Sequence, residues 1–186
     1  MNSQVELAYG ALSIVEILEK RGYELYRSDA LAIMKTFAKF KLFEKSEELE
    51  CWYDGGDDEE FASKAKDIMI IPNLSFNDLI QLRPEKAAKL LTPTDYYKFL
   101  ITKWIWPWPG VIQKINGFLN RFNLPLVEKM SRGFFRSWAL EPFLGLTRNR
   151  LTDCCCELVI QNLNNQDLYN ICLAAEIAAK EENRDT

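Results

Sequence analysis

The sequence predicts an all-α fold, an irregular multi-helix orthogonal bundle of about eight to ten helices, several of them short. Apolar residues recur at steps of three and four along most of the chain, and residues that start or end helices stand between these stretches. No sustained alternation of apolar and polar residues indicates a sheet. With 186 residues, 48% of them hydrophobic, the chain can build one core, so we expect a single helical domain over residues 1–186.

The first two predicted helices form an antiparallel hairpin. Ser3 and Glu6 have the spacing of a capping box, in which each side chain accepts a hydrogen bond from the other residue's backbone amide. Gly22 can end this helix with a positive φ, and Ser28 with Asp29 can begin the next one. The apolar stripe of the second helix consists of Leu31, Met34, Ala38 and Leu42, widened by Phe37 and Phe40.

An exposed acidic loop is expected near residues 44–60, where Asp and Glu residues crowd around two glycines. A helix that begins at Asp57 is expected to stop at Pro72. Within it, Ile68–Ile71 is the one short run that could instead form a strand. Several short helices should follow, because capping residues or first-position prolines recur at Ser75, Pro84 and 92–95.

The central part of the chain is predicted to contain three further helices. Residues 96–105 have helical spacing, and Pro107 with Pro109 should end that helix. Two more helices are expected from Gly110 to Arg121 and from Pro125 to Trp138, the second with proline at its first position.

The last two helices are expected from Arg148 onward and from Asn164 to about Lys180, with a frayed tail at residues 181–186. The residues of the first that we expect to face the core are Leu151, Cys155, Leu158, Val159 and Asn162. This helix pair resembles the closing helices of BTB-type adaptor domains, in a pattern carried by Leu151, Cys155, Leu158, Leu163, Asp167, Ile171 and Ala174. The preceding sequence lacks the strands and the histidine usual in that family, so we transfer no function from it.

The composition excludes the commonest catalytic designs. The chain contains no histidine, which removes Ser-His-Asp and Cys-His nucleophile systems, histidine metal ligands and imidazole catalysis. Gly55-Gly56 lies among carboxylates that would repel a phosphate, and the acidic residues around it do not match a calcium-binding EF-hand loop. We therefore predict a protein that is not an enzyme, with no catalytic residues, no metal site and no cofactor; an active site built on carboxylates, Lys, Tyr or Cys is the least favoured alternative.

The five cysteines do not have the spacing of a disulfide-rich secreted domain, since three of them are adjacent at Cys154, Cys155 and Cys156. Successive helical residues point in different directions, so these three cannot bind one metal ion, and Cys155 is expected in the core. A thiol switch involving Cys172 is the alternative. Because the N-terminus also lacks the features of a secretion signal and no transmembrane run is present, we expect a soluble, intracellular protein of the reducing cytoplasm.

Charge is distributed unevenly along the chain, although the net charge is only -4. Residues 83–150 carry 12 Lys and Arg against 4 Asp and Glu, whereas the segments on either side are acidic. Two explanations remain open: a surface for an anionic partner, or complementarity between segments that pack against one another.

The same basic segment is rich in aromatic residues and is the best candidate for a functional surface, because Trp and Arg are enriched at hot spots of protein interfaces. We predict a protein-interaction module, an adaptor or assembly factor, that docks another protein with an acidic or mixed apolar and acidic surface. Its predicted anchors are Trp104, Trp106, Trp108, Arg132 and Arg136. The alternatives are a nucleic-acid-binding protein and a peripheral protein of anionic membranes, both using this surface.

Overall fold

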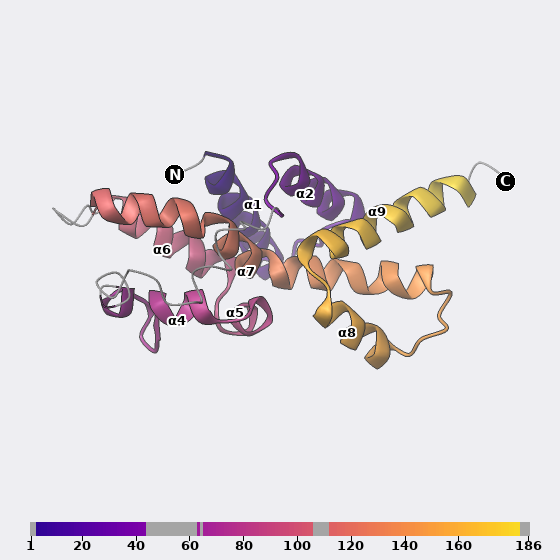
Figure 1. The fold of residues 1–186 in the computed structure, drawn as a ribbon. Coiled ribbons are helices and arrows are strands. Elements are labelled where there is room, and N and C mark those ends of the chain that lie inside the picture. The colour runs from indigo at the N-terminus through magenta and orange to yellow at the C-terminus, as the bar shows by residue number, and fades with distance from the viewer. Residues whose placement is uncertain (1–2, 44–62, 64, 106–111, 183–186) are drawn as a thin grey trace.

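The computed structural model describes residues 3–43, 63, 65–105 and 112–182, and in these residues the protein is all-α, as the sequence predicts. The elements in chain order are α1 (Ser3–Lys20), α2 (Arg27–Lys39), β1 (Met69–Ile71), β2 (Leu74–Ser75), α4 (Phe76–Gln81), α5 (Pro84–Leu90), α6 (Pro93–Ile105), α7 (Ile112–Leu146), α8 (Asp153–Asn162) and α9 (Asn165–Glu182) (Figure 1). None of the helices in the described ranges combines the length and the apolar character that a membrane span requires.

The long helix α7 is the centre of the bundle, and it contacts all the other helices whose bounds are given above. In Figure 1 it runs across the middle of the molecule, with α1 and α2 above it, α5 and α8 below it and α9 beside its C-terminal half. The core lies along α7 and contains an edge-to-face pair of rings, Phe37 from α2 and Phe135 from α7, whose centroids are 5.4 Å apart. The helices therefore pack around one central helix, α7, and do not form regular layers.

The predicted end of the first helix is confirmed at Gly22, which has φ +87°. The amide of Gly22 donates to the carbonyl of Glu19, and the amide of Tyr23 donates to that of Leu18. These two bonds form a Schellman motif, in which glycine is favoured because it adopts the left-handed conformation without a Cβ clash. The second helix begins near the predicted place, where Asp29 accepts a hydrogen bond from the backbone amide of Tyr26.

The helix that was expected to continue to Pro72 is wrong in its last part, because residue 67 is its last helical residue and the short run marked as a possible strand forms β1. This strand pairs antiparallel with β2, with Met69 opposite Ser75 and Ile71 opposite Leu74. Ser75 then caps α4: its hydroxyl accepts from the amide of Asp78 at 3.1 Å, and the Asp78 carboxylate accepts from the amide of Ser75. This capping box turns the chain from the two strands directly into a helix.

One helix, α7, replaces the two that the sequence predicts at Gly110–Arg121 and Pro125–Trp138. It spans 35 residues and contains Pro125 and Pro142. A proline inside a helix costs about 3 kcal/mol. Packing offsets this cost, because Leu126, Val127 and Met130 are at most 3% exposed, and burying each large apolar side chain contributes roughly 2 kcal/mol.

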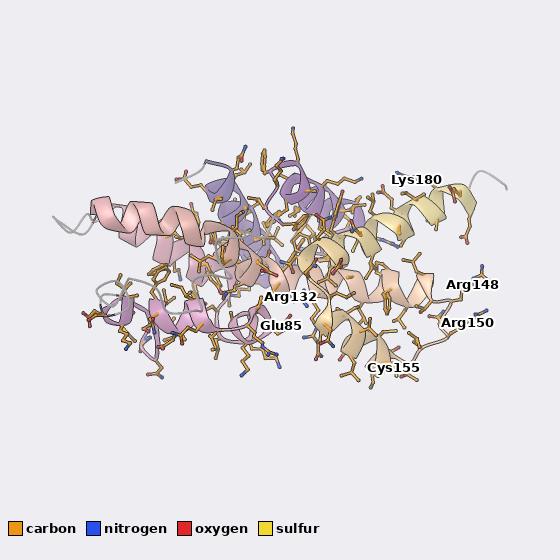
Figure 2. The ribbon with its side chains drawn as sticks, in the orientation of Figure 1. Glu85, Arg132, Arg148, Arg150, Cys155 and Lys180 are labelled. Carbon is orange, nitrogen blue, oxygen red and sulfur yellow. The ribbon has the colours of Figure 1, made fainter. Side chains whose placement is uncertain are left out.

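The face of α8 that was expected in the core points outward instead. Leu158 is 61% exposed and Val159 39% exposed, and Figure 2 shows Cys155 at the outer edge of the molecule. The buried residues are Cys156 and Ile160, at 0% and 1% exposure. Both faces of this short helix are apolar enough to be buried, so its apolar spacing alone does not decide which one meets α7.

The acidic loop expected near residues 44–60 lies outside the described residues. The same holds for residues 183–186 of the expected tail, whereas residues 181 and 182 complete α9.

Candidate functional site

Arg132 on α7 is the centre of a buried polar cluster and is 1% exposed. Its Nη2 lies 2.8 Å from Glu85 Oε1 on α5, and Nη2 also donates to the carbonyl oxygens of Ile160 at 3.1 Å and Gln161 at 3.2 Å. Its Nη1 donates to Asn165 Oδ1 at 3.2 Å. One guanidinium therefore satisfies carbonyls in the last turn of α8, where a cation is favoured, and holds the first residue of α9.

Asn165 links this cluster back to α7. It is 3% exposed, and its Nδ2 donates to Ser131 Oγ at 2.9 Å and to the Glu128 carbonyl at 3.1 Å. The Ser131 hydroxyl in turn donates to the Val127 carbonyl at 2.7 Å. Because unpaired polar groups in the interior cost free energy, this network fixes the end of α8 and the start of α9 against α7.

A groove of about 300 Å³ lies beside the cluster, between α5, α7 and α8. Its apolar lining comes from Ala88, Gly133, Leu140 and Ile160, and its polar lining from Glu85, Lys89, Arg132, Arg136, Ser137 and Glu157. A Cβ at Gly133 would lie 3.9 Å from the Ala88 Cβ, so two small residues keep α5 and α7 close at this point. The volume is at the lower end of the range for ligand pockets, about 300–1,000 Å³.

Arg136 is a partly exposed cation of this groove. It lies one helical turn beyond Arg132, and its side chain is 30% exposed. Its Nη2 is 4.0 Å from Glu157 Oε2, whose side chain is 50% exposed. This separation exceeds the hydrogen-bond range of about 3.2 Å, so the two charges attract one another without a direct hydrogen bond.

Three cations, Lys89, Arg132 and Arg136, and two carboxylates, Glu85 and Glu157, line the groove, so its lining has one more positive charge than negative. Burial lowers the pKa of Arg132, and the neighbouring carboxylates of Glu85 and Glu128 oppose this shift. An arginine remains charged in proteins at neutral pH. An incoming anion is therefore attracted to the Arg136 side of the groove.

The structure brings together two of the five predicted anchors, Arg132 and Arg136. Arg136 is partly exposed, and its role as an anchor stays a prediction. The expectation that Arg132 is an exposed anchor is corrected, because this residue is sealed in the interior and is bound by Glu85 and by backbone carbonyls. Trp104 belongs to α6, but its side chain lies outside the described part of the structure, as do Trp106 and Trp108 entirely.

Sequence reasoning missed the residues that complete the groove, Glu85, Lys89 and Glu157. Two signals were available. Arg132 and Arg136 are four residues apart and must share a face of any helix, and Pro84 places Glu85 in the first turn of α5. Neither signal tells which helix meets that face of α7.

Comparison with known protein families, with curated proteins and with solved structures finds no match for this chain. Among the described residues, no group of three or more Cys, Asp or Glu side chains is placed to hold a metal ion.

Proposed function

We propose that this protein is an interaction module, an adaptor or assembly factor without catalytic activity of its own, which binds a segment of another protein in the groove between α5, α7 and α8. The bound segment carries an aspartate or glutamate next to apolar side chains. Arg136 is the observation that supports this proposal. Its partly exposed guanidinium lines a cavity of about 300 Å³, and its Nη2 lies 4.0 Å from Glu157 Oε2, too far for a hydrogen bond.

The chemistry of the groove favours this kind of segment. A guanidinium binds a carboxylate through two parallel hydrogen bonds, and a hydrogen bond to a charged group contributes about 1.5–3 kcal/mol. Lys89 adds a second cation on the α5 side, while Ala88, Leu140 and Ile160 offer apolar contacts. Because the groove is small, we expect dissociation constants in the micromolar range, on the order of 1–100 µM.

The proposal is tested by selecting twelve-residue peptides from a random display library on the immobilised protein. We expect enriched peptides to contain Asp or Glu beside Leu, Ile or Phe. Their affinity should fall at least about ten-fold in Arg136→Glu, which reverses the charge that receives the carboxylate. It should rise in Glu157→Gln, which removes the competing carboxylate.

Lys86→Glu is the matched control, because Lys86 is an exposed cation on α5 that does not line the groove. Peptide affinity that stays the same in Arg136→Glu, or that falls equally in Lys86→Glu, contradicts the groove as the binding site. Arg136-dependent binding of single-stranded oligonucleotides or of anionic vesicles, with no acidic peptide selected, would replace the proposal by one of the two alternative functions.

A further inference from the structure

The outward face of α1 is apolar between Leu7 and Leu18. Four large side chains on it are exposed: Leu7 at 53%, Ile14 at 59%, Ile17 at 41% and Leu18 at 39%. The opposite face of the same helix is buried and includes Tyr9 and Leu12, each 1% exposed. A surface helix normally carries polar and charged residues on its outer face, so a helix that is apolar on both sides is expected to be covered on both.

The stripe on this face has a regular spacing. Leu7, Ala11, Ile14 and Leu18 follow one another at steps of four, three and four residues, the spacing with which one helix packs along another. Read from either end, the steps are the same. A stripe of this kind is complementary to a reversed copy of itself, which is the condition for a two-fold symmetric interface.

One pair of charges at the two ends, Glu6 and Arg21, favours the antiparallel direction, and Glu19 is a further exposed anion in the last turn. Glu6 lies in the first turn of α1, and Arg21 follows its last residue. Lys20 already forms an ion pair with Glu16 within the same chain, so Arg21 is the cation at this end that can pair with a carboxylate of a second copy. An antiparallel pair brings Glu6 of each copy to the end that holds Arg21 of the other, whereas a parallel pair juxtaposes like charges.

We propose that two copies of this protein associate through α1, packed antiparallel against its two-fold mate. In this register Leu7 of one copy faces Leu18 of the other, and Ala11 faces Ile14, so a small residue meets a large one at each central position. The interface is independent of the groove, because α1 and the pair α5 and α8 lie on opposite sides of α7 in Figure 1.

Tyr97 of α6 extends the same surface. It is 37% exposed, and its ring edge lies 3.9 Å from the position that a Cβ of Gly10 would occupy. Tyrosine is among the residues that contribute most at protein interfaces. One helix pair with an aromatic flank is smaller than a standard interface of about 1,600 Å², so the expected dimer is weak, with a dissociation constant on the order of 10 µM.

Sedimentation equilibrium of the purified chain between about 1 and 200 µM tests the proposal. We expect a monomer–dimer equilibrium for the wild type and at least ten-fold weaker association for Ile14→Asp, with Leu7→Asp as a second variant. Both side chains are more than half exposed, so the far-ultraviolet circular dichroism of the variants should match the wild type. A monomer at every concentration overturns the proposal.

Two further comparisons separate this interface from other ways of dimerising. Leu158→Asp on α8, which changes a side chain with 61% exposure outside α1, should leave the dimer intact, and loss of the dimer in this variant alone refutes the assignment to α1. Glu6→Arg and Arg21→Glu should each weaken association about two- to five-fold, and the double variant should recover it. Failure of the double variant to recover association contradicts the antiparallel arrangement.

Discussion

Replacing Arg132 by methionine should cause one of the largest losses of stability among single substitutions in this protein. Removing one member of a buried ion pair costs about 3–5 kcal/mol. The partner carboxylate, Glu85, is 29% exposed and can be rehydrated, which reduces the cost. Three acceptors nevertheless lose their donor, the Ile160 and Gln161 carbonyls and Asn165 Oδ1, at about 0.5–1.5 kcal/mol each. We therefore expect Arg132→Met to lower the free energy of unfolding by about 3–4 kcal/mol.

Urea denaturation followed by circular dichroism measures this loss. Arg136→Met is the control on the same helix, and it should cost less than about 1 kcal/mol because its ion pair is long and half exposed. Glu85→Gln, which keeps an acceptor beside Arg132, should fall between the two. A loss below about 1 kcal/mol in Arg132→Met would refute the conclusion that this residue joins α5, α7, α8 and α9.

Three further predictions concern positions outside the groove. Tyr9→Phe should leave stability unchanged or raise it by up to about 1 kcal/mol in urea denaturation, because the buried Tyr9 hydroxyl has no hydrogen-bond partner among the described residues. Burial acts to raise the pKa of Glu16, but hydrogen bonds from Lys20 and Thr94 outweigh it and the pKa is lowered. Glu16 therefore stabilises the fold above its ordinary pKa of 4.5 and loses this effect as the pH falls through its lowered pKa. Glu16→Gln should lower the free energy of unfolding by about 1 kcal/mol at pH 7, and the difference from the wild type should shrink progressively as the pH falls below 4.5. Arg148→Gly should raise the midpoint of thermal unfolding, with a gain of up to about 1 kcal/mol, because Arg148 has φ +54° in the turn that ends α7.

The fold class and the N-terminal helices could be predicted because their signals are local. The glycine that ends α1 and the carboxylate that starts α2 act on backbone groups a few residues away, so the sequence contains the whole interaction. The same reasoning holds for the Ser75 cap, whereas the helix expected up to Pro72 is replaced at Met69–Ile71 by a strand that pairs with β2.

The errors came from interactions between distant parts of the chain. Pro125 predicts a helix start, but packing of the residues after it keeps α7 continuous. Arg132 has the sequence character of a surface residue, and it is buried because Glu85, Ile160 and Asn165, 28 to 47 positions away, supply its acceptors. The expected inner face of α8 is outward for the same reason, since the contact of Ile160 and its carbonyl with the Arg132 cluster selects the other face.

Neither of the two explanations for the basic middle segment accounts for both arginines. Arg132 pairs with Glu85 of the same basic segment, whereas Arg136 remains partly exposed, with a long contact to Glu157 of the acidic segment that follows. The groove at Arg136 and the outer face of α1 therefore differ in chemistry, and salt should affect them in opposite directions. Screening weakens attraction between exposed charges, so peptide binding at Arg136 should weaken several-fold between 0.05 and 0.5 M salt. Apolar association is not weakened in this way and is strengthened by sulfate, so dimerisation through Ile14 and Leu18 should persist in sodium sulfate. If rising salt abolished both peptide binding and dimerisation, charge and not the apolar stripe would hold the two copies together.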